Sequence, residues 1–193
     1  MTDPGPGTQA GPPVPSIRTD RLELVSMSIP FLEALERDDV VAATGEIGAV
    51  VPADMPEDLA QFVRYRLATL AADPSRQPWL GRAMVLTDET GTRRVVGTIG
   101  FHDAPDEAGR VEIGYRVEPA YRRRGYALEA VRAMFDWAAE RGIRRFVASV
   151  APDNVASLAL IGRLGFREIG SQVDEIDGLE LVFEAAWPPS DGG

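Results

Sequence analysis

The chain of 193 residues contains no cysteine, no lysine and a single histidine, His102. Without cysteine, disulfides, thiolate catalysis and cysteine-based metal sites are excluded. One histidine cannot form a multi-histidine metal cluster, and we expect no metal. Without lysine, the chain has no Schiff-base former and no P-loop, which requires a lysine after its last glycine.

Long apolar runs are also missing near the N-terminus. Residues 1–16 are rich in proline and glycine and contain neither a basic start nor an apolar run, so we expect a disordered tail rather than a signal peptide or a membrane span. Residues 17–187 fit one domain, followed by a short tail over 188–193. The sequence predicts a soluble, cytoplasmic protein, and it leaves a homodimer open.

Positive charge is scarce. The net charge is −10 and the pI is about 4.6, which opposes attraction to nucleic acid or to an anionic membrane. We therefore expect neither partner. All twenty basic residues are arginine, a uniformity that codon usage in a GC-rich genome explains.

The periodicity of apolar residues predicts an α/β domain with a mixed sheet. Ser28 and Pro30 mark the start of one helix, and helical spacing recurs over 58–72, from 128 to 138 and after Asn154. We interpret 44–56 as a loop. Strands are expected over 17–27, 83–86, 94–102, 111–117, 145–150, 167–173 and 179–183, with Asp177-Gly178 as a hairpin turn between the last two.

The segment from Glu118 to Ala130 joins a strand to a helix through a turn containing three arginines and Gly125. The first turn of a helix has unpaired N–H groups and the positive end of the helix dipole, and it therefore attracts anions. Glycine allows a phosphate to approach the backbone. The turn is predicted to hold phosphate, although an arginine run alone is also typical of a solvated surface. A Rossmann turn is excluded because it needs three spaced glycines.

Three segments carry a resemblance to a known family. Arg122-x-x-Gly125-x-Ala127 resembles the pyrophosphate-binding signature of the GCN5-related N-acetyltransferases. The run from Asn154 to Phe166, which ends in Leu-Gly-Phe, resembles a later helix of that family. Arg18–Leu24 is similar to the first strand of the branch that includes the ribosomal-protein N-terminal acetyltransferases.

The resemblance implies a twisted mixed sheet whose two central strands splay apart, and acetyl-CoA as the acyl donor. It implies that the backbone of one splayed strand runs beside the pantetheine arm and that the turn after it holds the pyrophosphate. The cofactor-binding residues implied in this way are Ile113, Tyr115, Val117, Arg122, Arg123, Arg124, Gly125, Tyr126, Ala127 and Asn154.

Acetyl transfer to an amine needs a base, and Glu112 is our first candidate. It precedes the phosphate-binding turn on a strand, and burial raises the pKa of a carboxyl group towards neutrality. His102 is the alternative because imidazole titrates near neutral pH, and the two residues are expected to be cross-strand neighbours. Each also has a plain structural interpretation, as a solvent-facing strand residue and a surface histidine.

The proton for the departing thiolate is assigned to Ser157. Many members of the resembled superfamily use a tyrosine at the position of Ile161, which cannot act as an acid. The Asn-x-x-Ser pattern of Asn154 and Ser157 resembles the ribosomal-protein branch, where the serine is the proposed acid. Water is the alternative, and Asn154 is also interpretable as a helix cap.

The acceptor is expected to be an amine-bearing small molecule or a protein N-terminus. Candidate acceptor regions are the hairpin acids Asp174, Glu175 and Asp177, the loop over 44–56 and Pro78-Trp79. The alternative function is a non-catalytic module that binds acyl-CoA as a sensor. A nucleic-acid-binding protein using Arg122 to Arg124 conflicts with the net charge.

Overall fold

The computed structural model describes residues 14–174 and 178–189. Within them, eight strands form one sheet in the order β1-β2-β3-β4-β5-β6-β8-β7. β5 and β6 run parallel, whereas the other neighbouring strands run antiparallel. The strands are β1 (Ile17–Arg18), β2 (Leu22–Ser26), β3 (Arg82–Thr87), β4 (Arg93–Phe101), β5 (Arg110–Val117), β6 (Arg145–Val150), β7 (Arg167–Asp174) and β8 (Gly178–Ala186).

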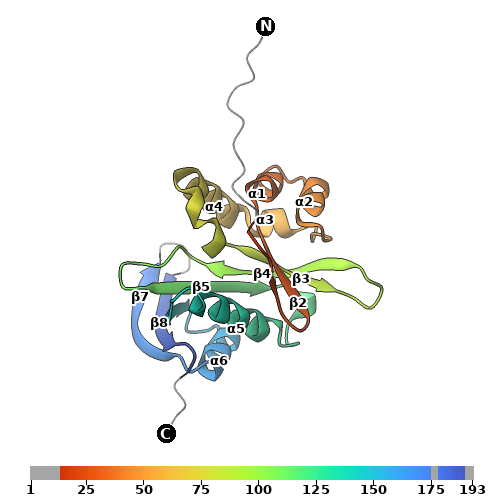
Figure 1. The fold of residues 1–193 in the computed structure, drawn as a ribbon. Coiled ribbons are helices and arrows are strands. Elements are labelled where there is room, and N and C mark those ends of the chain that lie inside the picture. The colour runs from red at the N-terminus through yellow and green to blue at the C-terminus, as the bar shows by residue number, and fades with distance from the viewer. Residues whose placement is uncertain (1–13, 175–177, 190–193) are drawn as a thin grey trace.

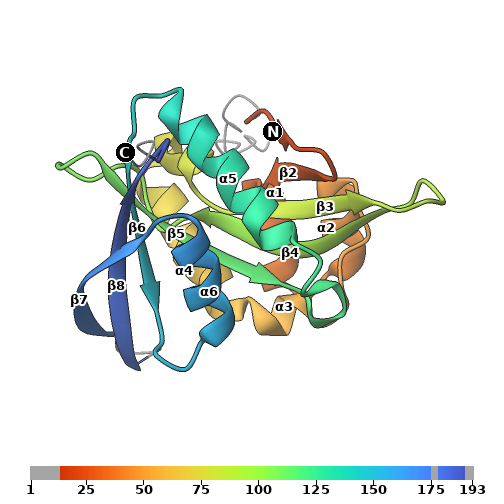
Figure 2. The same cartoon turned by 90° about the horizontal axis from the view of Figure 1, so that it is seen from below.

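Helices cover both faces of the sheet, as Figure 1 shows. One face carries α1 (Ile29–Glu36), α2 (Val40–Ile47), α3 (Met55–Asp58) and α4 (Ala60–Ala72). The other carries α5 (Tyr126–Ala139) and α6 (Val155–Arg163), which lie on the near side in Figure 2. Short 3-10 turns occur at η1 (Pro74–Trp79) and η2 (Pro119–Tyr121). The predicted α/β architecture with a mixed sheet is confirmed.

Alternation along the strands divides the core into two clusters, one on each face. In β3, for example, Met84 belongs to the cluster under α5, whereas Ala83 and Val85 belong to the cluster under α1 to α4. Phe135 of α5 stacks on Phe146 of β6, with ring centroids 4.0 Å apart. Strands β3 and β4 are therefore largely buried on both faces between the helical layers, whereas β7 at the edge of the sheet is exposed.

Two of the predicted elements are wrong in part. The interval 44–56 is not a continuous loop, because α2 extends to Ile47 and α3 begins at Met55. The Asp39 side chain caps α2, and Gly48 ends it in the left-handed conformation. We overlooked these two capping residues because the apolar period between them is weak. The first strand is divided by a turn at Thr19 to Arg21, since Leu22 O accepts a hydrogen bond from the N–H of Thr19.

The other predicted strands and helices are found with boundaries shifted by a few residues. Ser28 caps α1 through a hydrogen bond from Phe31 N–H, as predicted, and β7 pairs with β8. The predicted tails lie mostly outside the described residues, as do Glu175 and Asp177. No helix among the described ranges combines the length and the apolar character needed to cross a membrane.

Candidate active site

A gap opens between the two central strands of the sheet. The pairing of β5 with β6 covers three residue pairs and ends where Glu112 meets Val147. Beyond that point, β5 continues to Val117 paired with β4, and β6 continues to Val150 paired with β8. The predicted splaying of the central strands is confirmed, and it frees one edge of β5 after Glu112.

Helix α5 begins directly after the arginine-containing turn, with Gly125 as its N-cap at φ +85°. No side chain caps this helix, whereas Ser28, Asp39 and Asn154 cap α1, α2 and α6. The first-turn N–H groups of α5 therefore have no side-chain acceptor. This is the geometry that an anion such as a phosphate satisfies.

The three arginines of the turn are exposed, but they do not act alike. Arg122 Nε donates to Val117 O at 2.9 Å and so braces the turn against the end of β5. Arg123 adopts φ +60°, a left-handed conformation that bends the chain into the helix. The Arg124 guanidinium lies 5.6 Å from the centre of the Tyr121 ring. The turn therefore has a defined shape before any ligand binds.

Arg21 joins this turn from the β1–β2 connection, and our sequence interpretation missed it as a site residue. Its Nη2 lies 3.3 Å from the position that a Cβ on Gly125 would occupy, and its Nη1 donates to Arg124 O at 2.9 Å. Glu129 of α5 holds the same guanidinium through Nε at 2.7 Å. The available signal was its place in the Arg18–Leu24 segment, but only the fold brings it to α5.

On the opposite face of the sheet, Glu112 lies beside His102, as predicted. The His102 backbone N–H donates to Glu112 O at 2.8 Å, and His102 Nδ1 lies 3.7 Å from Glu112 Oε1. The imidazole covers Gly114, where a Cβ would approach Nε2 to 2.9 Å. The glycine therefore makes room for the histidine ring next to the carboxylate.

Glu112 and His102 open onto a cavity of about 380 Å³. It is lined by the β4–β5 loop and by β5, β6, β7 and β8, through His102, Asp103, Ala104, Asp106, Arg110, Val111, Glu112, Val147, Ile169, Gln172 and Val182. Asp106 pairs with Arg110 at 2.9 Å, and Asp103 pairs with Arg76 at 2.5 Å. Glu112, by contrast, faces the histidine.

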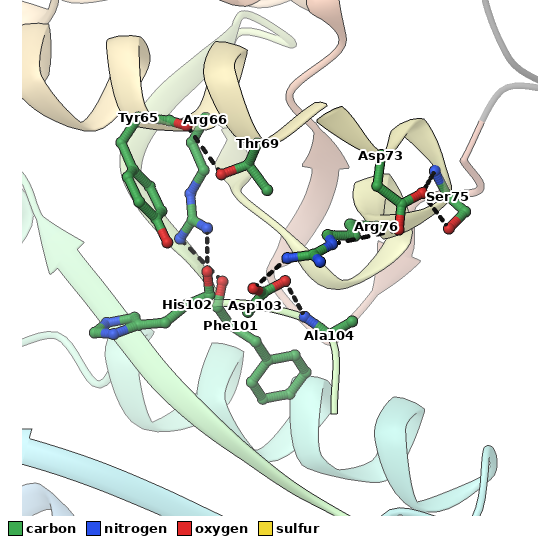
Figure 3. A network of polar contacts seen from close by, with 10 residues as sticks. All are labelled: Tyr65, Arg66, Thr69, Asp73, Ser75, Arg76, Phe101, His102, Asp103 and Ala104. Atoms are coloured by element: carbon green, nitrogen blue, oxygen red, sulfur yellow. Dashed lines mark hydrogen bonds and ion pairs between the residues drawn. The ribbon is translucent and has the colours of Figure 1, made fainter. Parts of the chain in front are cut away.

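The wall that carries His102 is tied to the helical layer above it (Figure 3). Arg66 of α4 donates from Nη2 to Phe101 O at 2.9 Å and from Nη1 to His102 O at 2.5 Å. Burial lowers the pKa of the Arg66 guanidinium. Together with the Arg76–Asp103 pair, this contact fixes the end of β4 and with it the histidine.

The remaining predicted residues lie on the α5 and α6 face. Asn154 Oδ1 accepts a hydrogen bond from Ser157 N–H at 3.1 Å, so Asn154 acts as the cap of α6. Ile161 is buried in the core at 2% exposure. Burial raises the pKa of the Tyr115 phenol on β5, and the Ser157 side chain opposes that rise.

Among the described residues, the cavity lining does not include those that we had considered for the acceptor; Glu175 and Asp177 lie outside the described ranges. Trp79 packs in the core against Trp137, with ring centroids 4.9 Å apart. The residues after α2 lie at the other end of β4, where Val50 bridges to Arg94. Asp174 is at the end of β7 and does not line the cavity.

Comparisons with known proteins show what the chain is similar to. A family model described as an acetyltransferase (GNAT) domain matches residues 29–167. The "Uncharacterized N-acetyltransferase YjdG" of Bacillus subtilis (strain 168) is 30% identical over 152 residues, which cover 78% of this chain and 88% of that protein.

Solved structures show the same fold. A GNAT-family acetyltransferase from Bacillus anthracis has a TM-score of 0.58 and 22% identity, covering 89% of this chain and 98% of that one. RimL, a ribosomal L7/L12 alpha-N-protein acetyltransferase solved in complex with coenzyme A, has a TM-score of 0.60 and 17% identity, covering 89% and 98%.

Proposed function

Since the chain belongs to the GNAT family of N-acetyltransferases, we propose that it moves an acetyl group from acetyl-CoA to a primary amine by direct attack on the thioester. The observation that carries the proposal is the position of Glu112. It is the last residue of β5 that pairs with β6, and it also lines the cavity. A base there reaches an amine at the point where the strands part.

The donor side of the gap fits coenzyme A in three respects. The N-terminus of α5 has no side-chain cap, Gly125 leaves its backbone open, and the buried Tyr115 hydroxyl has no partner among the described residues. Arg122 to Ala127 would hold the pyrophosphate, joined by Arg21, and the freed backbone from Ile113 to Val117 would align the pantetheine arm. The bound donor supplies the activated acyl group.

On the other side, Glu112 takes the proton that the amine loses as it attacks. His102 covers Gly114 and borders the same carboxylate, so it orients Glu112 and shapes the approach of the amine. Arg66 contributes by fixing the His102 carbonyl. These residues would place the acceptor nitrogen next to the thioester, with the amine entering the gap from the cavity side and the donor from the α5 side. Such positioning of the two reactants is what the reaction needs.

We assign the acceptor to the cavity of about 380 Å³, which is of the size of small-molecule sites. An amine-bearing small molecule or the first residues of a protein N-terminus would fill it. The N-terminus is favoured by one structural neighbour, RimL, which is an alpha-N-protein acetyltransferase.

The test is release of free thiol from acetyl-CoA in the presence of a panel of amines that includes peptide N-termini, amino acids, polyamines and amine-bearing antibiotics. We expect thiol release that depends on the amine, together with the N-acetylated product by mass spectrometry. Tight coenzyme A binding without thiol release from any amine would instead identify an acyl-CoA sensor.

A further inference from the structure

Arg110 is the one residue with a permanent positive charge among the described residues that line the cavity. An arginine stays charged at any working pH. Arg110 precedes Glu112 by two positions on β5, and because side chains alternate along a strand, both lie on the α4 face with their Cα atoms about 7 Å apart. The cation and the proposed base therefore border the same cavity.

The Arg110 guanidinium is only partly occupied by protein groups. Its Nε donates to Asp106 Oδ2 at 2.9 Å, whereas Nη1 and Nη2 donate to no acceptor within residues 14–174 and 178–189. Asp106 is itself fixed, because its Oδ1 accepts from the N–H groups of Ala108 and Arg110 at 2.9 and 2.8 Å. The side chain of Arg110 is 38% exposed. Its two terminal nitrogens are thus accessible, forked donors on an anchored base.

The carboxylates of the cavity wall, by contrast, already have partners. Asp103 Oδ2 accepts from Arg76 Nη1 at 2.5 Å, and Asp106 is occupied by Arg110. Glu112 remains, and it is the base that the reacting amine itself needs. A polyamine, which brings a second cationic group, would therefore find no unpaired carboxylate in the described part of this wall.

We propose that the acceptor carries a carboxylate close to its reacting amine, and that Arg110 binds this carboxylate through Nη1 and Nη2. The inference rests on the proposed acetyl transfer and narrows its acceptor to a free amino acid or to a peptide with an acidic first residue. A planar guanidinium matches a carboxylate through two parallel hydrogen bonds. A carboxylate held at Arg110 leaves the amine of the same molecule beside Glu112.

The test compares acceptors that differ in the carboxylate. One set contains the standard amino acids and their carboxamides, and a second contains dipeptide amides that begin with aspartate, glutamate, asparagine or glutamine. In Arg110→Gln, the KM for the acids rises about tenfold or more, since charged hydrogen bonds are lost, while kcat changes little. The KM for the matching amides stays near the parent value. The set with the lower KM in the parent identifies the source of the carboxylate.

The matched control is Arg145→Gln. Arg145 is the cross-strand neighbour of Arg110 on β6 and has its own carboxylate partner, Glu184, at 2.6 Å, but it does not line the cavity. This substitution removes the same charge one strand away, and it should leave the KM for acids and amides alike. Arg110→Glu reverses the sign at the site, so it should raise the KM for the acids further and lower that for ethylenediamine.

Folding and donor binding are checked separately. Arg110→Gln should keep a melting temperature close to that of the parent, because an exposed ion pair contributes little to stability. Its coenzyme A affinity by calorimetry should also be unchanged. An equal rise of KM for acids and amides in Arg110→Gln, or an equal effect of Arg145→Gln, overturns the inference.

The outcomes separate this inference from the proposed function. A parent that acetylates only amines without a carboxylate keeps acetyl transfer and ends the role of Arg110. A parent that acetylates no amine ends the proposed function itself. In that case calorimetry with aspartate in the presence of coenzyme A decides: binding that Arg110→Gln weakens and Arg145→Gln does not supports the carboxylate site, and absence of binding to the parent overturns it.

Discussion

The two faces of the gap between β5 and β6 are built differently. On the α5 and α6 face, the proposed donor side is one continuous stretch of chain, from Ile113 to Ala127, that offers mainly backbone groups. On the α4 face, the proposed acceptor side is a cavity assembled from side chains of the β4–β5 loop and of β5, β6, β7 and β8. The donor side is thus local in sequence, and the acceptor side is not.

This difference has a chemical consequence. Backbone N–H groups bind a phosphate whichever side chains surround them, so the donor side keeps its function as neighbouring residues change. The acceptor side depends on which side chains its strands and loop present. Changes on the α4 face should therefore alter turnover and amine affinity without altering coenzyme A affinity. Changes at Gly125 should alter coenzyme A affinity without altering amine affinity.

The largest effect is expected for Glu112→Gln. Removing the base should lower turnover at neutral pH by about a hundredfold or more, because glutamine keeps the shape but cannot take a proton. Steady-state thiol release measures the rate, and calorimetry should show unchanged coenzyme A affinity.

The matched variant is His102→Gln, whose turnover should fall less than that of Glu112→Gln. The assignment of the base is reversed if His102→Gln is the crippled enzyme while Glu112→Gln keeps the parent rate from about pH 5 to pH 8, the range in which a free imidazole changes charge.

Arg66→Met should act on stability and on the amine. Phe101 O and His102 O lose their guanidinium donor, and unpaired buried carbonyls cost about 1–3 kcal/mol. Thermal denaturation should show this loss, and the KM for the amine should rise as His102 moves. Arg64→Met is the control, because Arg64 is exposed on the same helix. Equal effects of the two substitutions would mean that the Arg66 contact does not support the site.

The smallest effect is expected for Ile169→Ala in the cavity wall. The side chain is 54% exposed, so losing three carbons should weaken amine binding by about 1 kcal/mol, a roughly fivefold rise in KM. Val173→Ala, on the same strand but outside the cavity lining, should change little. A changed coenzyme A affinity with an unchanged KM for the amine would place Ile169 on the donor side instead.

The same contrast explains how much could be predicted from the sequence. The strand–turn–helix unit around Gly125 and the pairing of Glu112 with His102 could be predicted, because apolar period and cross-strand spacing determine them. The splayed strands were predicted from the family resemblance. The α2 helix was missed because its apolar spacing is weak and its boundaries depend on Asp39 and Gly48.

Arg21 and Tyr115 show the limit of a sequence interpretation. Arg21 reaches Gly125 only because β1 and β2 lie beside α5, a contact across about a hundred residues that local patterns do not encode. Tyr115 was predicted as a backbone contact, whereas its unpaired hydroxyl is visible only once the core is assembled. The cavity wall from β7 and β8 was missed for the same reason.

Coenzyme A calorimetry on Gly125→Val and Gly142→Val tests the separation of the two faces most directly. The two glycines flank α5 with φ of +85° and +87°, so both substitutions impose the same backbone strain. A Cβ at Gly125 meets Arg21 Nη2 at 3.3 Å, at the start of α5 where we propose that the phosphate binds, whereas at Gly142 it meets nothing within 4 Å. Gly125→Val should abolish binding while Gly142→Val binds as the parent does. Equal affinity in the two variants would contradict the placement of the donor at this turn.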